Sequence, residues 1–455
     1  MKTMTVDEVA RAVGGRLCRG EADLRVTSVC TDSRRIRPGQ LFFALRGERF
    51  DGHCFVGQAV DAGAGAVVVE RTEEIGASTA AVIQVADTLA ALQELARYNR
   101  DKFRGPVIAI TGSTGKTSTK EMVAVVLSAR FKTLKTPGNM NNEIGLPLTL
   151  LEMDESHEAL VLEMAMRGPG EIAALCRVAR PTGAVITNIG EAHIGRLGSV
   201  DNIARAKGEI LDLLPADGFA VLHRDSPFIQ REAARCRGRV IYFGLGKDAD
   251  IRAENICSEA AANRFTILAG GERADVRMPL PGRHNVENAL AAAAVGLMLG
   301  IPLAEAAGAL ARAAQGDKRL EIFPHRGMTI INDTYNANPA STRAALDVLA
   351  GIAAVRRVAV LGDMLELGER AVPAHREIGA AAARRVDYLV AVGELAAEIA
   401  RGALAAGLPA GRVYCCRTNR EAADFLHRLL TAGDAVLIKG SRGMRMEEIV
   451  RELQK

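Results

Sequence analysis

The residues best suited to chemistry lie in one short segment, TGSTGKTSTKE at 111–121. The apolar run Val107–Ile110 before it predicts a buried strand, and Met122–Leu127 after it continues as a helix. A loop of small residues between strand and helix directs backbone N–H groups and the positive end of a helix dipole at one point. A lysine there adds a charge for phosphates, and the following hydroxyl can bind Mg²⁺. We therefore predict a phosphate-binding loop made of Gly112, Ser113, Thr114, Gly115, Lys116, Thr117 and Ser118.

The loop departs from the usual phosphate-binding pattern at one position. Ile110 stands where that pattern has a glycine, five residues before Gly115. An ordinary turn of small residues is the alternative. The agreement of strand, loop and helix favours phosphate binding.

More polar side chains follow predicted strands. The strand Ala159–Met164 carries Glu163 near its carboxyl end, and the strand Ala184–Thr187 is followed by Asn188 and His193. In an open α/β sheet, ligands sit outside the carboxyl ends of the strands. A carboxylate there, beside a phosphate loop, is suited to Mg²⁺. For His193, a metal-binding role and a structural role are equally open.

A lysine lies inside the helix predicted over 199–214. Taken alone, Lys207 would be a solvated lysine. The glycine that follows it, Gly208, is costly in mid-helix and indicates either a close approach by another group or a functional reason.

Three further segments allow two interpretations each. The amides of 136–145, Asn139 and Asn142 among them, suit a polar ligand and suit a turn equally well. The segments 31–34 and 43–53 could hold a diphosphate, although their residues alone favour a solvated turn. The polar residues 282–288 before an Ala-rich helix are expected for capping alone.

Polar clusters recur in the last third of the chain, at 332–339, 362–366 and 439–442. Each follows a predicted strand: Thr329–Asn332, Val358–Leu361 or Ala435–Ile438. At one sheet edge they would form a binding face opposite the phosphate loop. Three unconnected turns are the alternative.

The elements that position these residues predict an α/β protein of three domains. The chain of 455 residues is too long for one core. We expect a small N-terminal α/β domain over 1–86. A central domain over 87–315 enters through a helix at 88–103 and carries the phosphate loop on a mostly parallel sheet. A C-terminal domain over 316–455 is doubly wound and Rossmann-like, without a GxGxxG fingerprint.

Composition excludes several classes of protein. The net charge is only +4, and no basic tail or patch predicts nucleic-acid binding. Eight scattered cysteines without a CxxC pair predict neither disulfides nor zinc, and they suit a reducing cytoplasm. No signal peptide or membrane span is expected. The longest apolar run, 289–304, is Ala-rich and contains Pro302, so it predicts a buried helix and a turn.

Together these motifs resemble those of the Mur ligases of bacterial cell-wall synthesis, along nearly the whole chain. The motifs are TGSTGKTSTKE at 111–121, TPGNMNNEIGLP at 136–147, LEMAMRGPGEI at 162–172, TNIGEAHIGRLGS at 187–199, AKGEI at 206–210, GRHNVENALAA at 282–292, NDTYNANPAS at 332–341, LGDMLELG at 361–368 and KGSRGMRME at 439–447. Folylpolyglutamate synthetases share the phosphate loop and the histidine-asparagine segment. The segments 332–341 and 361–368, with ALRGERFDGH at 44–53, resemble family members that add D-alanyl-D-alanine.

The resemblance implies an ATP-dependent amide ligase. ATP would phosphorylate the terminal carboxylate of UDP-N-acetylmuramoyl-tripeptide, and the amine of D-Ala-D-Ala would attack the acyl phosphate. Because several anions meet, two Mg²⁺ ions and Lys116 would neutralise the developing charge. A monomer with only these small-molecule partners is expected.

The resemblance also implies residue roles. Catalytic positions would be Lys116, His193 and Lys207. The metal would be held by Thr117, Glu163, His193 and a carbamoylated Lys207. ATP would be contacted by the phosphate loop, Asn285, Asn288, Arg319 and Asp333. The dipeptide would be contacted by Tyr335, Asn336, Asn338, Asp363 and Glu366. The UDP substrate would be contacted by Ser33, Arg34, Gly47 and His53 at the UDP end and by Asn139 and Asn142 on the muramoyl peptide. One departure is Ala165, where the family usually has glycine.

The sequence also leaves other functions to compare with this one. The nearest is an amide ligase that adds another amino acid to the same precursor, or glutamate to folate. A phosphate-loop switch or transport ATPase would hydrolyse ATP without a peptide substrate. Intact Lys116, Glu163 and Lys207 disfavour a non-catalytic UDP-sugar-binding protein. Because two domains would contribute ATP contacts, we expect closure of the C-terminal domain onto the central one to assemble the site.

Overall fold

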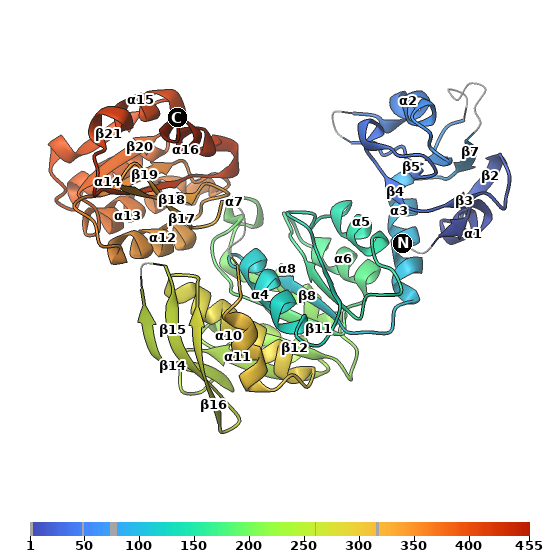
Figure 1. Ribbon diagram of the computed structural model, residues 1–455, viewed down its shortest axis with the longest axis horizontal. Coiled ribbons are helices and arrows are strands. Elements are labelled where there is room, and N and C mark those ends of the chain that lie inside the picture. The colour runs from blue at the N-terminus through green and yellow to red at the C-terminus, as the bar shows by residue number, and fades with distance from the viewer. Residues whose placement is uncertain (1–2, 48–49, 73–79, 260, 315–317) are drawn as a thin grey trace.

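The computed structural model describes residues 3–47, 50–72, 80–259, 261–314 and 318–455. Three main sheets of five, nine and six strands come from successive stretches of the chain. Figure 1 shows the N-terminal and C-terminal parts on opposite sides above the central part. The predicted three-part α/β architecture is confirmed. The domain limits at 86/87 and 315/316 stay predictions.

The N-terminal part is built on a five-stranded sheet in the order β2-β7-β6-β5-β4. Its strands are β2 (Arg16–Arg19), β4 (Val29–Cys30), β5 (Leu41–Phe43), β6 (Ala66–Val69) and β7 (Ala81–Gln84). Around it lie α1 (Val6–Ala12), α2 (Val56–Asp61), the 3-10 turns η1 (Ser33–Arg35) and η2 (Gly52–Phe55), and a ribbon of β1 (Met4–Thr5) and β3 (Arg25–Val26). All residues of β5 and β6 are buried, as expected for strands covered on both faces.

Helix α3 (Thr88–Asp101) connects the N-terminal part to the central part. It begins at Asp87, whose side chain accepts the Ala90 N–H. One continuous apolar core runs from α1 and the N-terminal sheet through α3 to the central sheet and the helices α5 (Gly145–Leu151) and α6 (Glu171–Ala179). The two parts therefore share a core.

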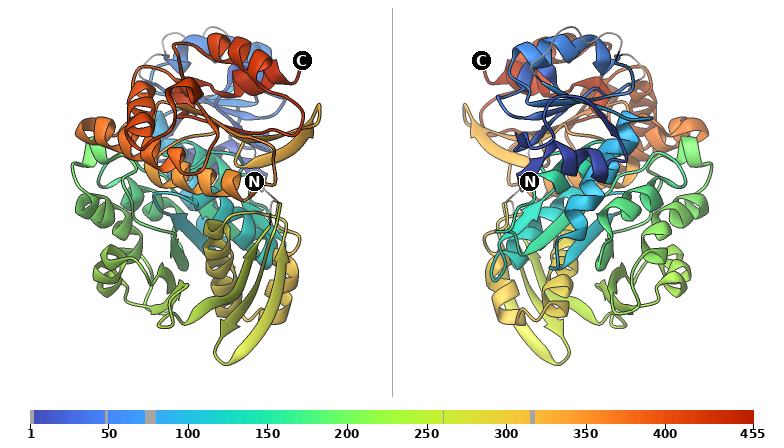
Figure 2. Two further views of the ribbon diagram at one scale, coloured as in Figure 1. Left: turned by 90° about the vertical axis from the view of Figure 1, so that its left-hand side faces the viewer. Right: turned by 90° about the vertical axis from the view of Figure 1, so that its right-hand side faces the viewer.

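The central sheet has the order β16-β15-β14-β13-β12-β11-β8-β10-β9. Its strands are β8 (Val107–Thr111), β9 (Thr133–Lys135), β10 (Ala159–Glu163), β11 (Gly183–Ile186), β12 (Phe219–His223), β13 (Arg239–Gly244), β14 (Ile251–Ser258), β15 (Asn263–Ala269) and β16 (Glu272–Met278). Strands β8 to β14 pair in parallel, and β14 to β16 form an antiparallel meander. The side views of Figure 2 show this meander pointing away from the two outer parts.

Helices cover both faces of the central sheet. On one face lie α4 (Lys116–Leu127), α10 (Arg283–Met298) and α11 (Leu303–Leu310). On the other face lie α5, α6 and α8 (Val200–Asp212), and short helices complete this part at α7 (Ile194–Leu197), α9 (Pro227–Glu232) and η3 (Ala233–Arg235). Residues 289–295 are fully buried in α10, and the chain turns before Pro302, so the predicted buried helix is confirmed.

The C-terminal sheet has the order β17-β18-β22-β19-β20-β21. Its strands are β17 (Glu321–His325), β18 (Met328–Asp333), β19 (Arg357–Gly362), β20 (Tyr388–Val392), β21 (Val413–Cys416) and β22 (Ala435–Lys439). The helices α12 (Pro339–Gly351), α13 (Ala371–Ala383) and α14 (Ala396–Ala405) cover one face; α15 (Asn419–Leu429) and α16 (Glu447–Leu453) cover the other. Short turns lie at η4 (Gly368–Arg370), η5 (Ala410–Arg412) and η6 (Arg442–Met444). The predicted doubly wound arrangement is confirmed.

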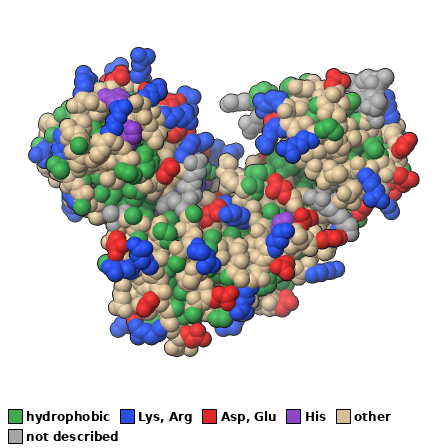
Figure 3. Space-filling view, in the orientation of Figure 1, with side chains coloured by type: hydrophobic (Ala, Val, Ile, Leu, Met, Phe, Trp, Pro, Cys, Tyr) green, Lys and Arg blue, Asp and Glu red, His purple; other side chains and the backbone are tan. Residues whose placement is uncertain are grey.

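The molecular surface is hollowed between the two outer parts, as Figure 3 shows. Within the stretches that the structure describes, no helix has both the length and the apolar character needed to cross a membrane.

Candidate active site

The phosphate loop joins β8 to α4 and lines a cleft of about 760 Å³. Gly112 and Gly115 have φ angles of 152° and 78°. A Cβ on Gly112 would lie 1.9 Å from Thr187 Oγ1, and one on Gly115 would lie 2.6 Å from Asn288 Oδ1. Both positions therefore require glycine. Ile110, which replaces the usual first glycine, is fully buried in β8.

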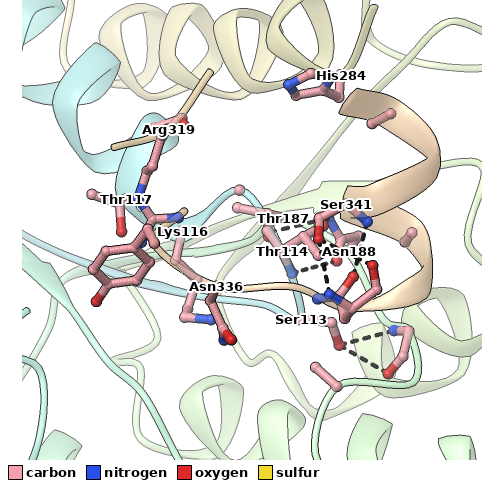
Figure 4. Close-up of a pocket in the computed structure, with 18 of the residues that line it drawn as sticks. Ser113, Thr114, Lys116, Thr117, Thr187, Asn188, His284, Arg319, Asn336 and Ser341 are labelled. Atoms are coloured by element: carbon pink, nitrogen blue, oxygen red, sulfur yellow. Dashed lines mark hydrogen bonds between the residues drawn. The ribbon is translucent and has the colours of Figure 1, made fainter. Parts of the chain in front are cut away.

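The segment after β11 holds this loop in place. Thr114 N–H donates to Asn188 Oδ1 at 3.0 Å, and Asn188 Nδ2 donates to Thr114 Oγ1 at 2.7 Å. Ser113 Oγ donates to Gly190 O at 3.0 Å. Figure 4 shows these bonds clustered beside Thr187. The loop conformation is therefore fixed by the neighbouring strand before any ligand binds.

Two cations face the cleft from different parts of the chain. Lys116 begins α4, and its Nζ donates to Gly112 O at 2.9 Å. Burial lowers the pKa of the Lys116 ammonium; the charge of Glu163 opposes this shift, and the charge of Arg319 adds to it. The Arg319 guanidinium lies over the Tyr335 ring, 3.9 Å from its centroid. Figure 4 shows Arg319 near Lys116 and Thr117. The pair suits a polyanion such as a nucleotide phosphate chain.

Glu163 ends β10 in a position that fits a divalent cation. Its side chain is buried, and Oε1 accepts from Asn141 Nδ2 at 2.8 Å. Within the described ranges, Oε2 has no hydrogen-bond partner. A buried carboxylate oxygen without a partner is costly, and Mg²⁺ would satisfy it together with the Thr117 hydroxyl in the same cleft.

The cleft does not form a metal site from protein carboxylates and histidines alone. Among the described residues, no three His, Cys, Asp or Glu side chains converge on one point. Mg²⁺ usually keeps few protein ligands and completes its shell with phosphates and water. The donor set around Glu163 therefore suits Mg²⁺ that arrives with a nucleotide.

His193 lies between β11 and α7 and lines the cleft. Its Nδ1 is 2.6 Å from Glu366 Oε2, which belongs to the C-terminal part. Burial lowers the pKa of the His193 imidazole, while the charge and hydrogen bond of Glu366 oppose the shift. Glu366 is outside the set of residues that line the cleft. Glu366 thus contacts His193 from the C-terminal part without itself facing the cleft.

Lys207 is 1% exposed inside α8 and is not among the residues that line the cleft. Burial, and to a smaller extent the charge of Lys116, lowers the pKa of Lys207 well below its usual value. A Cβ on Gly208 would lie 2.6 Å from Arg235 Nη1. The close approach predicted at this glycine is confirmed.

The start of α10 forms another wall. Asn288 lines the cleft, and its Oδ1 accepts from Thr119 Oγ1 at 3.1 Å. Asn285 does not line the cleft; its Nδ2 donates to Pro281 O at 2.8 Å, and its Oδ1 accepts from Asn288 at 3.3 Å. Asn285 therefore supports Asn288. His284 also lines the cleft. The sequence did not predict this, because the polar residues at 282–288 are expected for capping of the following helix alone.

Asp333 and Lys439 end the neighbouring strands β18 and β22. Asp333 Oδ2 accepts from Lys439 Nζ at 2.6 Å, and Oδ1 accepts the Leu320 N–H at 3.2 Å. Lys439 Nζ also donates to Asn336 O at 2.9 Å. Both charged side chains line the cleft. Lys439 lies in a predicted cluster but was not singled out.

The predicted C-terminal binding face is divided in the structure. Tyr335, Asn336 and Asn338 line the cleft. Asn338 also caps α12, because its Oδ1 accepts the Ser341 N–H at 2.9 Å. Asp363 lies outside the lining set, and its Oδ1 accepts the N–H of Ala396 at the start of α14, at 2.7 Å. Asp363 thus fixes a helix start rather than facing this cleft.

The cleft also receives residues from 136–165. Asn139, Asn141 and the half-buried Ala165 line it. Asn142 is not among the lining residues; its Oδ1 instead accepts the N–H of Gly145, the first residue of α5, at 2.9 Å. Ala165 N–H donates to Asn141 O at 3.0 Å. Asn141 was not singled out from the sequence, although it is the amide that holds Glu163.

The four N-terminal candidates lie apart from this cleft. His53 Nδ1 is 2.6 Å from Asp51 Oδ1, and its Nε2 accepts the Glu70 N–H at 2.9 Å, so Nδ1 carries the proton. The others also have protein partners: Ser33 Oγ donates to Gln58 in α2, Arg34 bonds to Asp32, and Gly47 N–H donates to Phe50 O. The contacts of Arg34 and Gly47 are turn contacts, whereas Ser33 and His53 also bond to residues distant in the sequence. A role of all four toward UDP stays a prediction.

Three protein-family models match successive parts of the chain. They are "Mur ligase family, catalytic domain" over 25–100, "Mur ligase middle domain" over 110–296 and "Mur ligase, glutamate ligase domain" over 318–442. The UDP-N-acetylmuramoyl-tripeptide--D-alanyl-D-alanine ligase of Bacillus subtilis is 41% identical over 99% of this chain and 98% of its own length. That of Escherichia coli is 38% identical over 100% and 99%.

Solved structures agree with these relatives. MurF from Acinetobacter baumannii has a TM-score of 0.93 at 35% identity and covers 100% of this chain and 99% of its own. The MurF ligase of Thermotoga maritima, solved in complex with ADP, has a TM-score of 0.83 at 30% identity and covers 94% and 97%.

Proposed function

The chain belongs to the Mur ligase family, and from this premise we propose that it is an ATP-dependent ligase joining D-alanyl-D-alanine to UDP-N-acetylmuramoyl-tripeptide. The observation that carries the proposal is the cleft between the central and C-terminal parts. There Lys116 and Arg319 meet the buried, partly unsatisfied carboxylate of Glu163. Cations and a carboxylate so placed suit a Mg²⁺ nucleotide.

The chemistry follows from the charges in the cleft. Lys116 and the N-terminus of α4 bind the phosphates, and Arg319 adds a second cation. Thr117, Glu163 and His193, which all line the cleft, would hold Mg²⁺. When bound, Mg²⁺ neutralises charge on the transferred phosphoryl group. The terminal carboxylate of the tripeptide attacks the γ-phosphorus and releases ADP. The D-alanyl-D-alanine amine then attacks the acyl carbon; phosphate leaves, and the amine loses a proton.

We propose that three residues define the nucleoside end of the cleft: Asn288, Asp333 and Lys439. Asn285 supports Asn288 from behind. Asn288 and Asp333 line its wall with polar atoms from two different parts of the chain. Tyr335, Asn336 and Asn338 would contact the dipeptide, and Asn139 the muramoyl peptide. Ser33, Arg34, Gly47 and His53 would lie at the UDP end. Domain limits at 86/87 and 315/316 and a cytoplasmic location complete the proposal.

We also propose that Lys207 is carbamoylated. Because its pKa is lowered, the Lys207 amine becomes neutral at a lower pH than an ordinary lysine does. A neutral amine can add CO₂ and release a proton. The resulting anion would be stabilised by the nearby charge of Lys116. Incubation with ¹³C-bicarbonate should give a carbamate carbon signal that Lys207→Met removes. Lys120→Met is the control, because Lys120 is equally buried but ion-paired with Glu121 at 3.0 Å. Persistence of the signal in Lys207→Met would contradict this role.

A ligation assay tests the main proposal. The protein is mixed with ATP, Mg²⁺, UDP-N-acetylmuramoyl-tripeptide and D-alanyl-D-alanine, and the product is identified by mass. We expect the amide product and one ADP for each product formed. Glutamate, lysine and meso-diaminopimelate serve as competing amines, and product formed with one of these instead would refute the dipeptide assignment. ATP turnover without any peptide substrate would favour a switch ATPase.

A further inference from the structure

The central and C-terminal parts meet closely where α7 contacts η4. Gly195 N–H donates to Glu366 O at 3.1 Å. A Cβ on Gly195 would lie 2.7 Å from Gly368 N, so here backbone touches backbone. Arg370 and Glu191 form an ion pair at 3.2 Å across the same contact. This close fit leaves little freedom in how residues 366–370 lie against 191–197.

The contact places one carboxylate directly against the imidazole of His193. His193 and Glu366 both have left-handed backbones, with φ of 63° and 64°. Such a conformation costs a non-glycine residue about 1–2 kcal/mol and persists only where the surroundings impose it. The two side chains meet at 2.6 Å, between Nδ1 and Oε2. An ionised carboxylate accepts only, so Nδ1 is the protonated nitrogen and Nε2 keeps its lone pair.

We propose that Glu366 is a positioning residue for His193, holding the tautomer and ring orientation in which Nε2 can bind a metal ion. The inference rests on the metal-binding role of His193 in the proposed function. A carboxylate behind a metal-binding histidine raises its basicity, and losing that carboxylate typically costs about 10–100-fold in metal affinity. Because Glu366 comes from the C-terminal part, the metal site is complete only when the two parts meet at this contact.

The first test uses the metal-free protein. Nitrogen-15 NMR of labelled imidazoles, at mildly alkaline pH, shows which ring nitrogen carries the proton, and a His193→Gln sample assigns the signal among the eight histidines. We expect the Nδ1–H form in the wild type and in Glu366→Gln, whose amide oxygen still accepts. In Glu366→Ala we expect a shift toward Nε2–H. Both variants keep a Cβ at the same left-handed position, so they carry equal backbone strain. An unchanged tautomer in Glu366→Ala would overturn the inference.

The second test measures binding of Mn²⁺, as a probe for Mg²⁺, in the presence of ADP by electron paramagnetic resonance. Glu366→Ala should weaken Mn²⁺ binding by about 10–100-fold, and Glu366→Gln should recover much of the loss. Arg370→Gln is the control, because it breaks the ion pair with Glu191 across this contact, and the one with Glu377 within the C-terminal part, without touching His193. Equal weakening by Arg370→Gln and Glu366→Ala would show a merely structural contact.

Two further variants separate this inference from the proposed function. His193→Ala should weaken Mn²⁺ binding, and adding Glu366→Ala to it should cause no further loss. If His193→Ala binds Mn²⁺ normally, the metal role of His193 fails. If His193→Ala weakens binding and Glu366→Ala does not, only the positioning role fails.

Discussion

The pair of Lys439 and Asp333 gives the most quantitative prediction. Lys439 has a side chain that is 2% exposed, and Asp333 one that is 11% exposed. The substitution Lys439→Met keeps most of the side-chain volume but removes both donors, to Asp333 Oδ2 and to Asn336 O. Among the described residues, Asp333 then keeps the Leu320 N–H as its remaining hydrogen-bond partner. A buried carboxylate without its counter-charge is the main cost.

Breaking a buried ion pair in this way costs about 3–5 kcal/mol. At about 1.4 kcal/mol for each tenfold change, the unfolding equilibrium of the C-terminal part should shift by roughly two to four powers of ten. Replacing both charges should remove most of this loss, because a well-packed apolar pair is often as stable as a buried ion pair. Lys439→Met combined with Asp333→Leu should therefore be more stable than Lys439→Met alone.

Hydrogen–deuterium exchange of β18 and β22 in increasing urea is a suitable assay. A chain of several domains does not unfold in two states, and this one has no tryptophan to report on a single part. The control is Arg376→Met, which breaks a 2.7 Å pair with Glu398 whose arginine is 56% exposed. It should cost less than about 1 kcal/mol. If Lys439→Met costs no more than this control, or if the double variant is the less stable, the argument fails.

Three further changes test other parts of the site. Lys116→Met should lower the ligation rate at least about 100-fold in a phosphate-release assay, because a charge on the phosphates is lost; an unchanged rate would refute its phosphate role. Gly115→Ala should raise the KM for ATP, since φ is 78° and Asn288 blocks the Cβ, whereas Gly308→Ala, with open space in α11, should leave KM unchanged. Burial raises the pKa of Cys176 from 9.0 to about 12. The thiol therefore ionises in the unfolded chain before it does in the folded one, so its contribution to the free energy of unfolding is full below pH 9 and falls as pH rises toward 12. Cys176→Ala should flatten the pH dependence of urea unfolding there, and an equally steep decline would contradict it.

The central strands β8 and β10 could be predicted from the sequence, while the edge strands β17 and β21 could not. Strands β8 and β10 are buried throughout, so each appears as an apolar run. Strand β17 carries Glu321 and Pro324 at an edge of the C-terminal sheet, where proline is tolerated. Strand β21, with the pattern VYCC, lies at the other edge. Neither was predicted, because one-sided burial leaves no clear pattern.

The phosphate loop and Glu163 were predictable because each depends on a local pattern: small residues between strand and helix, and a carboxylate at a strand end. The partner of His193 was not, since Glu366 lies 173 residues away. Asp363 and Glu366 share one short motif, yet one side chain bonds to Ala396 and the other to His193. Lys439 could be paired with Asp333 only once the order of β18 and β22 was known.

The core that the N-terminal and central parts share bears on which peptide is accepted. Because α3 and the apolar residues around it belong to both parts, the two parts pack together through one core and are not joined by a linker alone. Under the proposed function, the separation between the UDP end and the phosphate loop is then constant. A peptide shorter by one residue reaches about 3.3–3.6 Å less far. Since a misplacement of about 1 Å can cost 10²-fold in rate, this constant span would select a tripeptide over a dipeptide by length alone, without recognising any side chain.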